Sequence, residues 1–437
     1  MPDRHRTLYP ALCLGLLTAA FIVAKTGRDA LFFQGKGIFQ LPMATMMITA
    51  ASLPLALLFV KAMKSFGARP ARLGLMLFAA TVLTIAAPFL QPGDSPLLFN
   101  VFIFIPAVFG IMFASLWLLA NDIFETAPKA EAARAFGKIG ASSLAGGMAG
   151  GFIAKWIGPL IEPKWLIFIG ALLILVVIAL VIQAHRKFPT NLKPKDKSEK
   201  KGSYLAPLAK PYALVLLFTA MAGALAGLLI DVQFYISATS ASMGSKGNAN
   251  FFANFYIMLN FSSLLLQLFV APRIQDKLGI GAGLMILPFA LLGGAGFASA
   301  AATAFSLSVL RVTEGGLRSS IHRSIWEQAF VPVDANERSL VKIAVDGIGA
   351  RVAEGLAAAG LYFWVQRVAP GGVVTAPLDT RWMAWLTFAT VVVWLFVAQR
   401  LRNQVRQTAA AKTAPEIDCV RFPDQCPCTT ELGKGVG

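Results

Sequence analysis

Charged side chains are scarce in this sequence: they make up 14% of its 437 residues, whereas hydrophobic residues make up 57%. A soluble domain usually carries about 25% charged residues. Apolar runs of about 20 residues, each long enough to cross about 30 Å of hydrocarbon, recur along most of the chain. The short alternating segments of a membrane β-barrel are lacking. The sequence therefore predicts an all-α polytopic membrane protein.

Sequence motifs for bound cofactors are also lacking. The chain has no P-loop, no glycine-rich dinucleotide turn and no HExxH zinc motif, so nothing points to an enzyme, to ATP hydrolysis or to a cofactor. Of the four cysteines, Cys13 lies in the first apolar run, and Cys419, Cys426 and Cys428 lie near the C-terminus. No histidine accompanies those three, so we predict no metal site and an unstructured tail over 401–437.

Positive charge is in excess, with a formal net charge of +17. Such a balance could indicate nucleic-acid binding. However, the basic residues lie mostly between apolar runs, where orientation signals belong, and no soluble basic domain collects them. We therefore expect membrane lipid around the chain and no nucleic-acid partner.

The apolar runs predict about twelve membrane-spanning helices in two groups of six. The expected spans lie near residues 8–30, 38–63, 72–91, 97–120, 136–158 and 165–183, and then near 212–236, 251–271, 279–299, 301–320, 341–366 and 382–400. The halves are thus residues 1–183 and 211–400. The basic segment between them, 184–210, is predicted to be a flexible cytoplasmic linker, because lysine and arginine concentrate in cytoplasmic loops. Six spans on each side then place both termini in the cytoplasm.

The two halves resemble each other in sequence. LFVKAMKSFGARPARLGLML, from Leu58, aligns with LFVAPRIQDKLGIGAGLMIL, from Leu268, and ARAFGKIG aligns with ERSLVKIA. RDALFF aligns with IDVQFY, which pairs Asp29 with Asp231. Two six-span repeats joined by a cytoplasmic linker are the pattern of major-facilitator transporters, which bind substrate between the halves. We expect the two aspartates to face each other there, while the fold leaves the substrate open.

Several predicted spans contain charged side chains, which cost about 2.5–3.5 kcal/mol each at the centre of a bilayer. They are Lys25, Arg28 and Asp29 in the first span, Asp231 in the seventh, Arg311 and Glu314 in the tenth, and Asp346, Arg351 and Glu354 in the eleventh. Such residues usually mark a substrate or ion pathway, in which cations would hold an anion and carboxylates would carry a proton or select a cation. Structural ion pairs, or charges that reach the interface, are the alternative.

The eleventh span is amphipathic. At about 100° per residue, its charged residues share one side and an apolar stripe lies on the other. The stripe consists of Val345, Ile348, Val352 and Leu356. We predict that the stripe faces lipid and that the charged side faces protein or a water-filled cavity.

Small residues form a surface on the fifth span. Its glycines are Gly140, Gly146, Gly147, Gly150 and Gly151. Such a surface predicts close helix packing rather than a binding site.

Two longer segments carry a resemblance to a known family. WLLANDIFETAPKAEAARAFGKIGA, from Trp117, and EQAFVPVDANERSLVKIAVDGIGAR, from Glu327, resemble the fourth-to-fifth and tenth-to-eleventh span segments of the ATP/ADP translocases. The first span ends in GRDAL, which resembles that family's basic–Asp motif and implies that Arg28 replaces its functional lysine. IDV resembles the acidic position of the seventh span, with Asp231 in place of glutamate. The resemblance covers nearly the whole chain and implies a major-facilitator fold and the exchange of nucleotides or related anions.

The chain also departs from that family's pattern. The fourth span has no acidic residue between Phe102 and Leu119, Glu354 stands where a lysine is expected, and the charges around residues 322–326 differ. These departures argue against strict ATP/ADP exchange. The substrate would carry fewer phosphates or be another anionic or zwitterionic metabolite, with proton coupling through Asp231 or Glu354.

Three functions remain open at this point. The first is an alternating-access carrier of a nucleotide or other phosphorylated metabolite, in which Arg28, Arg311 and Arg351 hold the anion. The second is a proton-driven carrier of a non-nucleotide solute, and the third is a membrane receptor or assembly factor without transport. No serine-rich, acid-poor transit segment precedes the first span, which favours a bacterial inner membrane.

Overall fold

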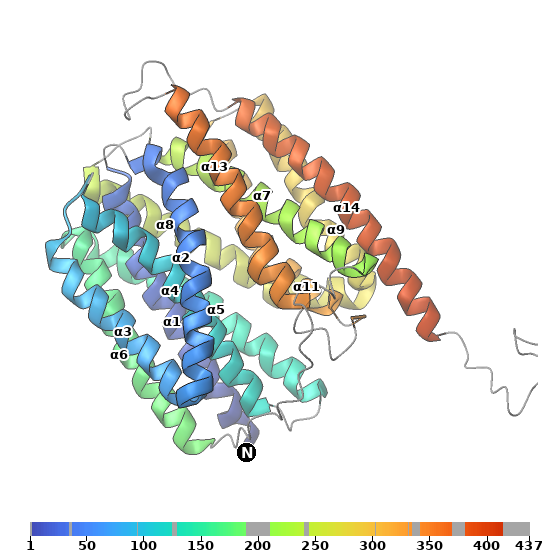
Figure 1. The fold of residues 1–437 in the computed structure, drawn as a ribbon, viewed down its shortest axis with the longest axis horizontal. Helices are drawn as coiled ribbons and strands as arrows, with labels where there is room; N and C mark the ends of the chain where they lie inside the picture. The colour runs from blue at the N-terminus through green and yellow to red at the C-terminus, as the bar shows by residue number, and fades with distance from the viewer. Residues whose placement is uncertain are drawn as a thin grey trace, which may run out of the picture.

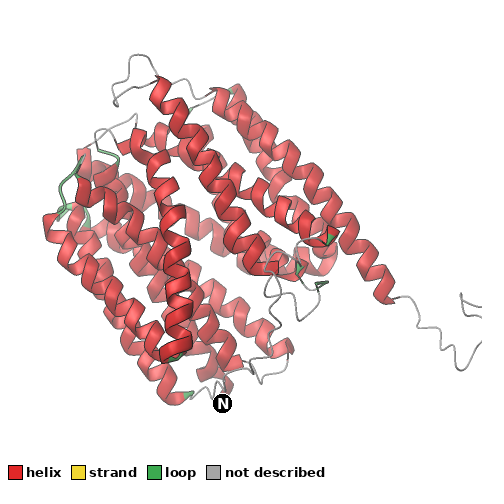
Figure 2. Ribbon diagram, in the orientation of Figure 1, coloured by secondary structure: helices red, strands yellow, loops and turns green. Residues whose placement is uncertain are grey.

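The computed structural model describes residues 2–34, 37–93, 95–124, 129–188, 210–239, 244–301, 303–330, 332–333, 341–368 and 381–413. These residues form long helices without a strand (Figure 2). The first half contains α1 (Pro2–Phe32), α2 (Gly37–Phe66), α3 (Ala68–Ala86) with the short η1 (Ala87–Phe89), α4 (Pro96–Phe124), α5 (Lys129–Ile157) and α6 (Pro163–Lys187). The second contains α7 (Pro211–Thr239), α8 (Gly244–Leu265) with η3 (Leu266–Val270), α9 (Ala271–Ala300), α10 (Ala304–Leu317) with η4 (Arg318–His322) and α11 (Arg323–Ala329), η5 (Ile343–Gly349) with α13 (Ala350–Val368), and α14 (Arg381–Thr413).

These elements confirm about twelve spans in two groups of six (Figure 1). Within the described ranges, nine helices are long and apolar enough to cross a membrane by length and composition. The other three are α5, the α10–η4–α11 rod and the η5–α13 rod, which occupy the fifth, tenth and eleventh places. They combine glycine with intramembrane charge, which lowers their hydropathy.

Local sequence explains where two neighbouring spans separate. Gly279 has φ 68°, a conformation that glycine adopts without steric cost, and it interrupts the helix between the eighth and ninth spans. Thr303 caps α10 in a reciprocal capping box with Ser306, which divides the ninth span from the tenth although no charged loop lies between them.

Two predicted boundaries were wrong. Helix α14 continues to Thr413, so the first part of the predicted unstructured tail is helical. Its apolar stripe continues past residue 400, where Leu401 is buried. Helix α6 likewise continues to Lys187, past the predicted start of the linker. Most of the linker and the three tail cysteines lie outside the described residues.

The helical wheel predicted for the eleventh span was wrong at its start. Residues Ile343–Gly349 form a π-helix, whose i→i+5 bonds turn each residue by less than the 100° of an α-helix. Val345 is therefore buried, whereas Ile348, Val352 and Leu356 are exposed as predicted for the lipid side.

The fifth-span glycines make two close seams, which confirms the packing interpretation. A Cβ at Gly146 would lie 1.9 Å from the carbonyl oxygen of Gly15 on α1. A Cβ at Gly147 would lie 2.3 Å from Oδ1 of Asn260 on α8, in the other half. Helix α5 is thus held between its own half and the second half. Helices α2 and α13 also contact each other across the halves, as do helices α1 and α8.

The halves share buried apolar side chains mainly near one end of the bundle. The largest apolar cluster joins the first half to C-terminal-half residues near the end of α7 and the start of α8, including Phe234, Tyr235 and Phe252. Two further clusters contain C-terminal-half residues alone, and one of them lies near the start of α7. There, Arg323 reaches across with its guanidinium carbon 5.6 Å from the ring centre of Trp117.

Candidate functional site

Asp29 is the centre of a buried polar site near the end of α1. Its side chain is completely buried. Nε and Nη2 of Arg28 donate to Asp29 Oδ1 at 2.7 and 2.5 Å. Lys25, one turn earlier, lies with its Nζ 3.2 Å from Asp29 Oδ2. The predicted cations of the first span therefore hold their own aspartate.

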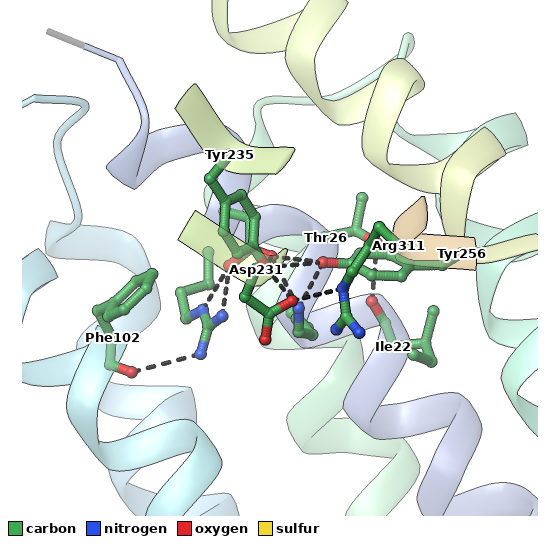
Figure 3. Close-up of polar contacts among 10 residues, drawn as sticks. Ile22, Thr26, Phe102, Asp231, Tyr235, Tyr256 and Arg311 are labelled. Carbon is green, nitrogen blue, oxygen red and sulfur yellow. Dashed lines mark hydrogen bonds and ion pairs between the residues drawn. The ribbon is translucent and has the colours of Figure 1, made fainter. Parts of the chain in front are cut away.

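The second half completes the coordination of Asp29. The hydroxyl of Tyr256, on α8, donates to Asp29 Oδ2 at 2.6 Å, and that of Tyr235, on α7, lies 3.2 Å from the same oxygen. Lys25 Nζ donates to the hydroxyls of Tyr235 and Tyr256 at 2.8 and 2.5 Å. Figure 3 shows Tyr235 and Tyr256 near Asp231 and Arg311. The site thus joins the two halves through buried, charge-assisted hydrogen bonds.

A chain of alternating charges continues from this point into the C-terminal half. Arg311 on α10 forms ion pairs with Asp231 on α7 and with Glu314 one turn further along α10. Glu314 also pairs with Arg318. Arg318 donates to the carbonyl of Gly223 at 2.7 Å. Lys25 also interacts electrostatically with Asp231. This interaction connects the row of alternating charges to the residues around Asp29.

We call these seven charged residues the central ion cluster. Its members are Lys25, Arg28, Asp29, Asp231, Arg311, Glu314 and Arg318. The structure therefore brings six of the nine predicted site residues together at the boundary between the halves, in agreement with the predicted approach of Asp29 and Asp231.

The aromatic side chains near the cluster already have partners. Phe33 stacks on Tyr235 with ring centres 4.4 Å apart. The guanidinium carbon of Arg28 lies 4.1 Å from the ring centre of Phe102, and Lys25 Nζ lies 4.5 Å from that of Tyr256. These rings therefore pack against the cations and against one another.

The other three predicted site residues lie elsewhere. Asp346 Oδ1 accepts a hydrogen bond of 2.9 Å from Nε1 of Trp326. Arg351 pairs with Glu354 at 2.8 Å, and this described pair has no ion pair with the central cluster. The π-helical turn explains the separation, because it rotates Asp346 away from the other two. Arg351 and Glu354 fit the alternative of a local i,i+3 pair.

Sequence reasoning missed two members of the site. Tyr256 lies in an apolar span without a charged motif, so only its contacts identify it. Arg318 was not among the predicted site residues, although its spacing of four residues from Glu314 places both on one helix face. No group of three or more metal-ligating side chains occurs among the described residues.

The contribution of the Tyr256 hydroxyl to stability can be tested with a variant that lacks this oxygen atom. We expect Tyr256→Phe to lower the free energy of unfolding by about 1–3 kcal/mol, because the buried Asp29 carboxylate loses a hydrogen bond. Tyr362→Phe is the matched control on a partly exposed ring, for which we expect little change. Denaturant unfolding of the purified protein in detergent measures both. Equal stability of the two variants would contradict the assigned contact.

Comparison with known proteins identifies the fold. No protein-family model matches this sequence, and no curated protein does either. A mutant of the nucleoside transporter NupG superposes with a TM-score of 0.63 at 16% identity, covering 91% of this chain and 99% of NupG. An autoinhibited POT family peptide transporter gives a TM-score of 0.60 at 13% identity, covering 91% and 97%. A bacterial homolog of the human lysosomal transporter Spinster gives 0.54 at 14% identity, covering 92% and 98%. The chain therefore has the major-facilitator fold of two six-helix halves.

Proposed function

We propose that this protein is a secondary-active transporter that binds a small anionic metabolite between its halves and works by alternating access. The observation that carries the proposal is the central ion cluster. It lies at the boundary between two six-helix halves, where carriers of this architecture bind their substrates. Lys25 and Asp29 on α1 share hydrogen bonds with Tyr235 and Tyr256 of the second half, so a ligand that engages these groups acts on both halves at once.

Nucleotides and related phosphorylated metabolites are the substrate class that the resemblance to the ATP/ADP translocases favours. Arginine suits such anions, because its planar guanidinium forms two parallel hydrogen bonds to a phosphate or carboxylate. Arg28 belongs to the first half and Arg311 to the second, so each half contributes an arginine to the cluster. NupG, one of the similar structures, is a nucleoside transporter. By the distribution of basic loops, we further propose that both termini lie in the cytoplasm, and we propose a bacterial inner membrane as the location.

A ligand screen tests the proposed function. Purified protein is melted in the presence of ATP, ADP, AMP, nucleosides, sugar phosphates, vitamin phosphates and amino acids. A ligand that binds only the folded state adds about 2.7 kcal/mol at about 100 times its Kd. Each ligand that raises the Tm is then tested for uptake and counter-exchange in proteoliposomes. A protein that binds solutes without moving any would contradict the transporter proposal and favour the receptor or assembly-factor alternative.

Arginine variants test the site. We expect Arg28→Ala and Arg311→Ala each to reduce uptake about tenfold or more, because an ion pair with the anion is worth more than 1.4 kcal/mol in a dry site. Arg400→Ala, on an exposed position of α14, is the control and should leave uptake unchanged. Unaltered uptake by both site variants would refute the assignment. Reduced uptake by Arg351→Ala would indicate that Arg351 belongs to the substrate pathway. Unchanged uptake would indicate that Arg351 only forms a local pair with Glu354.

Proton-driven transport of a non-nucleotide solute is the second candidate. It is favoured by Asp231, whose side chain is 35% exposed while the other carboxylates of the cluster are almost fully buried. Such a group can exchange protons with water more readily than its neighbours. Uptake that collapses with a protonophore, and that disappears in Asp231→Asn, would establish this mode, whereas exchange insensitive to a protonophore would exclude it.

A further inference from the structure

The central ion cluster does not balance its own charges. Its four cations are Lys25, Arg28, Arg311 and Arg318, and its three carboxylates are Asp29, Asp231 and Glu314. We count each of the seven groups in the charged form in which it makes its ion pair. The cluster therefore holds one net positive charge.

Sharing of carboxylates accounts for this excess. Asp29 is shared between Lys25 and Arg28, and Glu314 between Arg311 and Arg318. Among the described residues, Asp231 forms an ion pair with Arg311 alone, and Arg311 is also paired with Glu314. An additional anion would thus find cations that do not have a carboxylate of their own.

Three other groups of charged residues in the described helices are balanced locally. Arg351 pairs with Glu354, and Arg72 lies 3.7 Å from Asp122. Near Asp346 lie the carboxylate of Glu327 and the cations Arg323 and Lys342. The charges of these four groups cancel. The uncompensated charge is therefore a property of the central ion cluster and not of the whole interior.

Three of the four cations of the cluster are partly exposed. Exposed fractions of the side chains are 16% for Lys25, 18% for Arg311 and 37% for Arg318, whereas Asp29 and Glu314 are at most 3% exposed. A solute that enters the site meets these three cations and Asp231, whose side chain is 35% exposed, whereas Asp29 and Glu314 stay behind them.

From this imbalance we infer that the site takes a solute with one net negative charge: a monocarboxylate, a phosphodiester or a zwitterion with one excess negative charge. A single charge neutralises the cluster. A nucleoside di- or triphosphate would leave several negative charges in a site of low dielectric, where unpaired charge is costly. This inference rests on the proposed function and narrows its substrate from anions in general to singly charged ones.

Two series of compounds with graded charge test the inference. Nicotinamide, nicotinate and quinolinate place no, one and two negative charges on a pyridine ring. Adenosine, cyclic AMP, AMP and ADP grade the charge on a nucleoside. Binding to the intact protein in detergent is measured by thermal shift and by calorimetry. We expect the singly charged member of a series to bind about tenfold tighter than its neighbours, since one unmatched charge costs at least that much at close range.

Charge variants make the test independent of the skeleton of the true substrate. Arg318→Gln brings the cluster to zero and Asp231→Asn brings it to two positive charges, while Arg311 and Glu314 retain each other in both. Arg318→Gln should bind the neutral compound of each series most tightly, and Asp231→Asn should bind the doubly charged compound most tightly. Arg318→Lys and Asp231→Glu keep the charge and should keep the wild-type order. Each variant is first checked for a single symmetric elution peak.

The outcomes separate the two proposals. Preference for a doubly or more highly charged compound by the wild type, the same preference in all charge variants, or no binding in either series would overturn the inference. Exchange of ATP for ADP in proteoliposomes would also overturn it while leaving the transporter proposal intact. Binding of the singly charged member without any flux would support the inference and contradict transport.

Discussion

Replacing Asp29 with alanine is expected to lower the free energy of unfolding by about 3–5 kcal/mol, because it leaves two buried cations without a carboxylate. Arg28 is 4% exposed and donates two hydrogen bonds to this carboxylate, and Lys25 lies 3.2 Å from it. The hydroxyls of Tyr235 and Tyr256 lose their acceptor as well. Denaturant unfolding in detergent, followed by circular dichroism, measures the change.

Glu162→Ala is the control for this prediction. Glu162 also forms an ion pair, at 2.6 Å with Lys164, but its side chain is 62% exposed. Surface pairs contribute about 0–1 kcal/mol, so we expect a small effect there. If Asp29→Ala were no more destabilising than Glu162→Ala, the buried site would contribute little to holding the halves together, and its assignment as an interface between them would fail.

Valine at Gly146 is expected to have the second large effect, a loss of about 3 kcal/mol or failure to fold, because a backbone atom blocks the new side chain. Its Cβ would lie 1.9 Å from the Gly15 carbonyl oxygen and 2.7 Å from the Gly15 Cα. Backbone in the middle of a packed helix cannot move aside as a flexible side chain can, so overpacking here falls at or beyond the upper end of the usual range of about 1–3 kcal/mol.

Gly140→Val isolates this steric effect on the same helix. A Cβ at Gly140 has no atom within 4 Å, and valine has a slightly better helix propensity than glycine. The Gly140 variant should therefore be as stable as the wild type or slightly more stable. Comparable yields and Tm values for the two valine variants would show that α1 and α5 do not approach as closely as the structure indicates.

Most of the architecture and about two thirds of the candidate site could be predicted from the sequence. Length and hydropathy located the spans, because a helix that crosses lipid must be apolar over about 20 residues. The internal repeat brought Asp29 and Asp231 together before any coordinates were considered. Tyr256 was not predictable, because a hydroxyl in an apolar span acquires its role from the carboxylate that packing brings to it.

Asp346 shows the limit of periodicity. The wheel placed it beside Arg351 and Glu354, but a π-helical turn between residues 343 and 349 changes the phase of the helix. Such a turn has no simple sequence pattern, since it depends on how η5 packs against α7. The end of α14 was misjudged for another reason. A polar composition after residue 400 resembles a loop, although buried Leu401 and Val405 continue its apolar stripe.

The unequal distribution of the apolar core has a calorimetric consequence. A conformation that separates the halves at the end of α7 removes Phe33 from Tyr235 and Phe252 and brings these rings into contact with water. Newly hydrated apolar surface raises the heat capacity by about 0.45 cal/mol/K per Å². The balance between conformations open at opposite ends should therefore curve with temperature, and cooling should make the hydration of these rings less unfavourable.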